Sequence, residues 1–125
     1  MRSIDTIEQF HEARVAMQPV YITSRTHGRV EVPCMNTMLV RVELVLENLY
    51  NPNSVSPDKM ALLQQSILDN GVCFPVVTIW DDEQQRFVVI DGAHRRMIHG
   101  SDWLDCDYIP LVVLSHGMSK RLAAT

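Results

Sequence analysis

The feature that most constrains the fold is the stretch PVVTIWDDEQQRFVVI, residues 75–90. Two runs of β-branched and aromatic residues, PVVTIW and RFVVI, lie on either side of the polar segment DDEQQ. Such residues favour strands, and a short polar segment between two such runs is typical of a hairpin. The stretch therefore predicts two antiparallel strands. The carboxylates of Asp81, Asp82 and Glu83 suit a solvated turn better than a metal site.

A helix is predicted directly before this hairpin. Ser56 can cap the free amides of a first turn, Pro57 is tolerated at the first helical position, and Gly71 stops the helix. Apolar residues recur at the spacing of an amphipathic helix: Met60, Leu63 and Ile67.

The order of the remaining elements predicts the fold class. Residues 37–49 indicate a strand that passes into a short helical turn, and 50–59 indicate a loop. A short helix is predicted over 94–99, closed by Gly100, and a last strand over 108–115. The order strand, helix, hairpin, short helix, strand predicts a compact α+β domain with a mixed sheet and short helices.

The N-terminal third carries a separate pattern. An amphipathic helix is predicted over residues 4–17, with Ser3 as its cap and Pro19 beyond its end. The segments VYITS and RVEVP, joined by RTHG, indicate a small hairpin. We expect residues 1–30 to form an accessory layer.

Composition and charge bound the classes of function. A length of 125 residues indicates one domain, and a net charge of −4 argues against a dedicated DNA-coating protein. The three cysteines, Cys34, Cys73 and Cys106, are odd in number and far apart, so no zinc site or disulfide framework is expected. We expect the protein to lie in a reducing cytoplasm and its thiols to be buried and inert. No signal peptide and no membrane-spanning run are recognisable.

The segment DGAHRR, residues 91–96, joins a predicted strand to a predicted helix. A helix start suits an anion, and the small residues of this turn allow a phosphate to approach the backbone. Arg95 and Arg96 can form charge-assisted hydrogen bonds to it, and His94 can donate a proton or act as a base. Asp91 can act as a catalytic base or simply cap the helix. The motif alone fits solvated arginines equally well.

Three segments in this order resemble the ParB/sulfiredoxin-like superfamily: NPN (51–53), LLQQSILDNGVCFPVVTIW (62–80) and FVVIDGAHRR (87–96). The family pattern is an Asn-Pro box, a helix L-x-x-S-I-x-x-x-G, then x-x-P-V-x-V, and a strand ending in D-G-x-H-R or G-E-R-R. The resemblance covers residues 31–114, the predicted main domain, and 115–125 are predicted to be a tail. The matching positions are Leu63, Ser66, Ile67, Gly71, Pro75, Val76, Ile79, Asp91, Gly92, His94 and Arg95.

The resemblance implies a pocket for a nucleoside triphosphate, CTP or ATP, with or without Mg²⁺. Its implied phosphate cradle is Gly92, Ala93, His94 and Arg95, with Arg96 flanking. The implied structural or wall residues are Asn51, Asn53, Ser66, Gly71 and Pro75. Asp91 and His94 are the candidate catalytic groups, and no metal ligand of the protein is predicted.

One departure from the family concerns chemistry. Ala93 stands where sulfiredoxins place their catalytic cysteine and partition proteins a glutamate, so sulfinate repair and efficient hydrolysis are not expected. We also expect no helix-turn-helix after the last strand. The first hypothesis is a small phosphotransfer enzyme or nucleotide-gated switch from a phage or mobile element.

Two further hypotheses stay open: a DNA-binding or nuclease-like accessory protein, and a catalytically inactive protein-interaction module. A protein partner or homodimer is compatible with any of the three hypotheses. The cations available to DNA are HRR with the nearby Arg86, and Lys120-Arg121 in the tail. We therefore expect weak, non-specific DNA binding that nucleotide displaces, and no membrane association.

Overall fold

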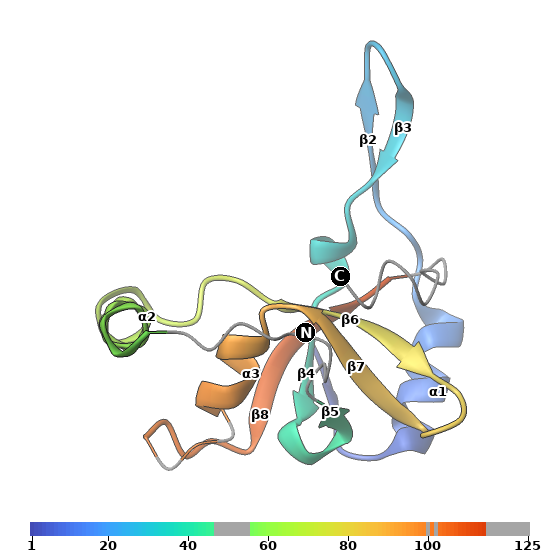
Figure 1. The fold of residues 1–125 in the computed structure, drawn as a ribbon. Coiled ribbons are helices and arrows are strands. Elements are labelled where there is room, and N and C mark those ends of the chain that lie inside the picture. Colours follow the sequence, from blue (N-terminus) through green and yellow to red (C-terminus); the bar gives the residue numbers. More distant parts are fainter. Residues whose placement is uncertain (47–55, 100, 102, 115–125) are drawn as a thin grey trace.

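The computed structural model describes residues 1–46, 56–99, 101 and 103–114, and its centre is a mixed β-sheet (Figure 1). The six strands have the order β1-β4-β8-β6-β7-β5. Their bounds are β1 (Arg2–Ile4), β4 (Met38–Arg41), β8 (Tyr108–Val113), β6 (Val76–Asp81), β7 (Arg86–Asp91) and β5 (Val45–Leu46). The pairs β4–β8 and β6–β7 are antiparallel, and β1–β4, β6–β8 and β5–β7 are parallel. The sheet confirms the predicted α+β class.

The hairpin of β6 and β7 forms as its sequence predicts. The Asp81 carboxylate closes the turn, because its Oδ1 accepts the backbone N–H groups of Glu83 at 2.9 Å and Gln84 at 3.2 Å. Alternate side chains, such as Phe87 and Val89 in β7, are fully buried. This alternation places one face of the sheet in the core.

Helix α1 (Ile7–Ala16) packs on the sheet through an aromatic cluster. The ring centroid of Phe10 lies 4.6 Å from that of Phe87 and 4.7 Å from that of Trp80. Aromatic pairs at such distances contribute beyond their buried area. The N-terminal third therefore contributes α1 to the core and β1 to the main sheet.

The start of α1 differs from the prediction. Ser3 lies inside β1, opposite Leu39, so the expected Ser3 cap is wrong. Thr6 caps the helix instead: its Oγ1 accepts the N–H of Gln9 at 3.2 Å, and Gln9 Oε1 accepts the N–H of Thr6 at 3.2 Å. This reciprocal capping box fixes where the strand ends and the helix begins.

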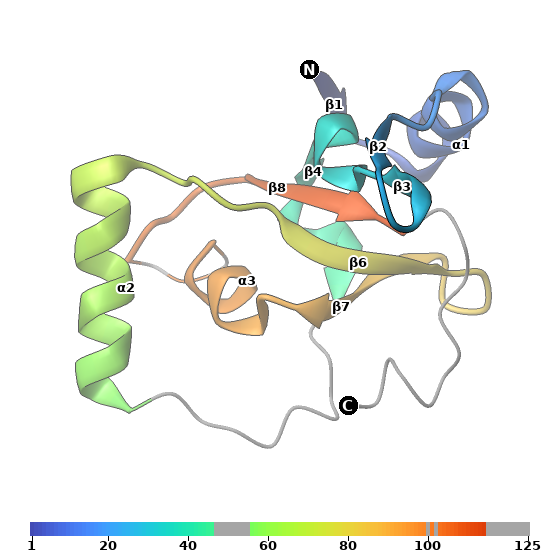
Figure 2. The ribbon, with the colours of Figure 1, turned by 90° about the horizontal axis from the view of Figure 1, so that it is seen from above.

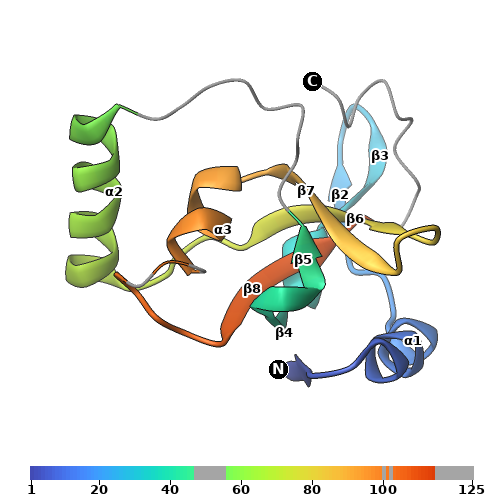
Figure 3. The same cartoon turned by 60° about the horizontal axis from the view of Figure 1, so that its bottom comes forward.

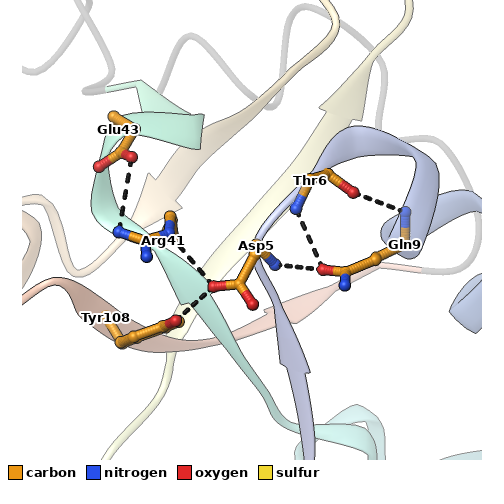
Figure 4. Close-up of polar contacts among 6 residues, drawn as sticks. All are labelled: Asp5, Thr6, Gln9, Arg41, Glu43 and Tyr108. Carbon is orange, nitrogen blue, oxygen red and sulfur yellow. Dashed lines mark hydrogen bonds and ion pairs between the residues drawn. The ribbon is translucent and has the colours of Figure 1, made fainter.

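A polar network ties this N-terminal junction to the sheet (Figure 4). The Asp5 carboxylate accepts hydrogen bonds from the Tyr108 hydroxyl of β8 and, at 3.2 Å, from Arg41 Nε of β4. Arg41 also forms an ion pair with Glu43, with 3.9 Å between its Nη1 and Glu43 Oε1. The hydrogen bond to Asp5 is the main cause of the raised pKa of Tyr108.

Helix α2 (Pro57–Asn70) has the predicted ends but stands apart from the sheet (Figures 2 and 3). Ser56 Oγ accepts the N–H of Lys59 at 3.3 Å, and Gly71 follows the last turn with a φ of 78°. None of its residues is buried, so its apolar stripe is not part of the core. No helix within the described ranges is long and apolar enough to cross a bilayer.

Strands β2 (Tyr21–Ser24) and β3 (Gly28–Glu31) form the predicted N-terminal hairpin, which we call the hairpin arm. The arm is a separate two-stranded sheet that projects from the body of the molecule (Figure 1). A 3₁₀ turn, η1 (Pro33–Asn36), connects it to β4, and a second turn, η2 (Val42–Leu44), follows β4. Helix α3 (Ala93–His99) follows β7.

Candidate functional site

A pocket of about 560 Å³ lies beside the turn that joins β7 to α3, and we call it the glycine-turn pocket. On the side of α3, it is lined by residues at the start of β6 and on either side of the turn at Gly92: Phe74, Pro75, Val77, Asp91 and Arg95. Sites for small molecules typically have volumes of about 300–1,000 Å³, so the pocket is large enough for a nucleotide. It brings together three residues that the sequence selected: Pro75, Asp91 and Arg95.

Gly92 forms the turn between β7 and α3. Its φ of 92° lies in a region that L-residues with a side chain rarely adopt. A Cβ at this position would lie 3.5 Å from Val76 Cγ2, so the turn rests against the first residue of β6. The carbonyl of Gly92 accepts the N–H groups of Arg95 at 3.0 Å and Arg96 at 3.1 Å, which closes the turn.

Among the described residues, Arg95 is the cation that lines the pocket. Its side chain is partly buried, and its guanidinium carbon lies 5.1 Å from the centroid of the Phe74 ring. Such a contact holds the guanidinium plane in place while leaving its N–H groups available to an anion. This geometry suits recognition of a phosphate.

The neighbouring Arg96 has a different role. Its Nε donates a hydrogen bond to the carbonyl oxygen of Val45 at 2.8 Å, and Arg96 does not line the pocket. The bond fixes β5, the strand that leads into residues 47–55. Arg86 lies at the opposite end of β7 from Asp91, so the expected cluster of HRR with Arg86 does not form.

The other predicted site residues lie elsewhere. Ser66 is exposed on α2, and Gly71 ends that helix, so neither lines the pocket. Asn51 and Asn53 lie outside the described residues. Ala93 and His94 begin α3, but their side chains are outside what the structure describes.

The sequence did not reveal the opposite side of the pocket. Residues of the hairpin arm and η1 line it: Ile22, Glu31, Val32, Pro33 and Cys34. A resemblance that begins at residue 31 gives no reason to place the arm beside Arg95. The only local signal is the apolar character of the arm, which an accessory role also explains.

The prediction of buried thiols is wrong for two of the cysteines. Cys34 and Cys73 are exposed rather than buried, because η1 and the connection between α2 and β6 both lie at the surface. Cys106 is partly buried, with its Sγ 3.1 Å from Nδ1 of the buried His99. Burial lowers the pKa of His99 and raises the pKa of Cys106, so the pair is held neutral.

The residues present fit a phosphate-bearing ligand. Arg95 offers a partly buried cation, and it follows the tight turn at Gly92. Asp91 is exposed in the same pocket, and a carboxylate beside phosphates favours binding together with a cation. Among the described residues, no three His, Cys, Asp or Glu side chains gather into a metal site of the protein's own.

No protein-family model matches the chain. The chain is 32% identical over 125 residues to the uncharacterised protein YbdM of Escherichia coli (strain K12). This match covers 97% of the chain and 56% of YbdM, so the chain spans little more than half the length of this relative.

Two solved structures resemble the chain in three dimensions. Sulfiredoxin from Arabidopsis thaliana matches with a TM-score of 0.53 and 21% identity, over 64% of this chain and 85% of sulfiredoxin. The C-terminally truncated chromosome-partitioning protein ParB from Caulobacter crescentus, complexed with CTP-gamma-S, matches with a TM-score of 0.58 and 14% identity. That match covers 70% of this chain and 48% of ParB. The resemblance read from the sequence is confirmed: the chain has the ParB/sulfiredoxin-like fold.

Proposed function

We propose that the protein binds a nucleoside triphosphate in the glycine-turn pocket, with the phosphates against Arg95. The observation that carries this proposal is a partly buried arginine, Arg95, which lines a pocket of about 560 Å³ directly after the turn at Gly92. A protein of the same fold, the Caulobacter ParB, is complexed with CTP-gamma-S, which makes CTP the first candidate and ATP the second.

One residue of this chain would bind the phosphates and a second would position it. The Arg95 guanidinium would form charge-assisted hydrogen bonds to phosphate oxygens, each stronger than a neutral hydrogen bond. Gly92 would act indirectly, because its positive φ allows the tight turn that precedes Arg95. A Mg²⁺ ion bound with the nucleotide would supply further positive charge, which is why Asp91 can share the pocket with phosphates.

The proposal includes two modes of action. A nucleotide-gated switch needs binding alone, which Arg95 and the turn at Gly92 can supply. Phosphotransfer also needs a group that accepts a proton from the acceptor, and Asp91, exposed in the pocket, is the first candidate, with His94 the second. Release or transfer of the terminal phosphate would indicate phosphotransfer, and binding without it would indicate a switch.

A thermal-shift panel of CTP, ATP, GTP and UTP, each with Mg²⁺ and with EDTA, tests the proposal. A ligand present at 100 times its dissociation constant adds about 2.7 kcal/mol to stability, so the expected shift is readily measured. Arg95→Ala should abolish most of the shift, whereas Arg86→Ala should keep it, because Arg86 lies at the far end of β7. Equal shifts for the parent and Arg95→Ala would refute the phosphate assignment.

A further inference from the structure

The two sides of the glycine-turn pocket differ chemically. On the side of α3, Arg95 supplies a positive charge beside the Phe74 ring. On the side of the hairpin arm, the pocket is lined by the apolar side chains of Ile22, Val32 and Pro33. A polyphosphate without a base would be attracted only to the first side. The second side suits a ligand with a flat, apolar part.

Two of the apolar lining residues are unusually exposed for their type. Ile22 is 60% exposed and Phe74 is 63% exposed, although both lie at the pocket. Covering such surface with an apolar ligand group is favourable, because it removes the apolar surface from water. An aromatic ring in this position can also stack on a nucleobase.

The arm is built to present an apolar face. Ile22 lies directly opposite Val30, and residues directly opposite one another share one face of a two-stranded sheet. On the other face, the guanidinium carbon of Arg29 lies 4.0 Å from the centroid of the Tyr21 ring. The arm therefore separates its apolar and polar side chains, and its apolar face contributes Ile22 to the pocket.

Charge also distinguishes the two sides. The cation Arg95 lies on the α3 side beside the exposed carboxylate of Asp91, whereas the arm side contributes the apolar residues Ile22, Val32 and Pro33. A phosphate is attracted to Arg95, and a Mg²⁺ ion bound with the nucleotide would offset the charge of Asp91. The position of the cation therefore favours one orientation of a nucleotide, with its phosphates toward α3 and its base toward the arm.

We propose that the arm side of the pocket binds the base of the nucleotide, so the hairpin arm selects nucleotides over free polyphosphates. The inference rests on the proposed function, because it takes Arg95 to bind the phosphates. It adds a specificity role for Ile22, a residue of the arm that lies outside the glycine turn.

Calorimetric titration with ATP, CTP and inorganic tripolyphosphate, all with Mg²⁺, tests the inference. Stacking on one aromatic side chain contributes roughly tenfold in affinity, so both nucleotides should bind at least about tenfold more tightly than tripolyphosphate. Arg95→Ala should weaken all three ligands. Phe74→Leu removes the stacking ring and also the contact that holds Arg95, so it should weaken the nucleotides strongly and tripolyphosphate to a smaller extent.

The arm itself is tested with a matched pair of variants. Ile22→Thr should weaken the nucleotides about three- to tenfold and leave tripolyphosphate unchanged, since the change removes apolar surface from the pocket. Val30→Thr makes a similar change on the same face of the arm, opposite Ile22, but Val30 does not line the pocket. Val30→Thr should therefore leave the affinities for ATP, CTP and tripolyphosphate unchanged. Both substitutions keep a β-branched side chain, and circular dichroism verifies that each variant is folded.

Alkylation of the cysteines gives a second readout. Cys34 lines the arm side of the pocket and is exposed, whereas Cys73 is exposed but does not line it. Bound ATP or CTP should slow alkylation of Cys34 by N-ethylmaleimide, and tripolyphosphate should not. The rate at Cys73 serves as the internal control, and peptide mass spectrometry separates the two sites.

The outcomes separate this inference from the proposed function. If tripolyphosphate binds as tightly as the nucleotides, or if Ile22→Thr binds the nucleotides like the parent, the arm does not bind the base. In that case an effect of Arg95→Ala would still support the phosphate site. If the parent binds none of the ligands, or if Arg95→Ala changes none of the affinities, the proposed function and this inference both fail.

Discussion

Replacing Gly92 by alanine tests the turn on which the pocket depends. Gly92 has a φ of 92°, and an L-residue with a side chain in such a conformation costs about 1–2 kcal/mol. The new Cβ would lie 3.5 Å from Val76 Cγ2, which is an ordinary contact, so no clash adds to this cost. Alanine also restricts the unfolded chain, which offsets part of it. The expected net loss of stability is therefore about 1 kcal/mol.

Urea unfolding followed by circular dichroism measures this loss, and a thermal melt should show a midpoint lower by about 4 °C. Gly28→Ala is the matched control, because Gly28 also has a positive φ of 72° but lies in the hairpin arm with open space around its Cβ. Both variants should lose similar stability. Only Gly92→Ala should also weaken nucleotide binding, since the turn carries Arg95. If Gly92→Ala is as stable as the parent, the turn does not require glycine.

Three further predictions concern the N-terminal junction and the ligand class. Because the hydrogen bond to Asp5 raises the pKa of Tyr108, the neutral phenol stabilises the fold below about pH 10, and this contribution is lost as the pH rises through the raised pKa. The stability difference between the parent and Tyr108→Phe, measured by urea unfolding from pH 7 to 11, should therefore shrink above pH 10; a constant difference would contradict this. Thr6→Ala removes the cap of α1 and should cost about 0.5–2 kcal/mol in the same assay, whereas Ser3→Ala should cost less than that. Duplex DNA should bind weakly in an anisotropy titration near physiological salt and be displaced by CTP or ATP, and tight, sequence-dependent binding that resists nucleotide would make DNA recognition the primary function.

The features that the sequence predicted well are those with local causes. The ends of α2 follow from a serine-proline start at Ser56 and a glycine stop at Gly71, and both act within one turn of the helix. The β6–β7 hairpin follows from two β-branched runs and a turn that the Asp81 carboxylate closes. Such signals need no knowledge of the rest of the chain.

The features that escaped prediction depend on contacts between distant segments. Strand β1 has only Arg2–Ile4, too short for a periodic pattern, and it forms because β4 offers an edge to pair with. The role of Arg96 follows from its bond to Val45, 51 positions earlier. The arm side of the pocket has the same origin, because Ile22 and Arg95 meet there only through the tertiary fold.

The most direct test of the account is a residue-resolved NMR titration of the isotope-labelled protein with CTP and with ATP, in the presence of Mg²⁺. If the phosphates bind at Arg95 and the base at the arm, the backbone amide signals of Gly92 and Arg95 should shift similarly with CTP and ATP, whereas those of Phe74 and Ile22 should shift differently because the two bases differ. A smaller hollow of about 160 Å³ beside α1, lined by Arg14 and Met17 among others, offers a competing place for an anion. Shifts confined to that hollow, or no shifts at millimolar nucleotide, would show that the glycine-turn pocket is not a nucleotide site.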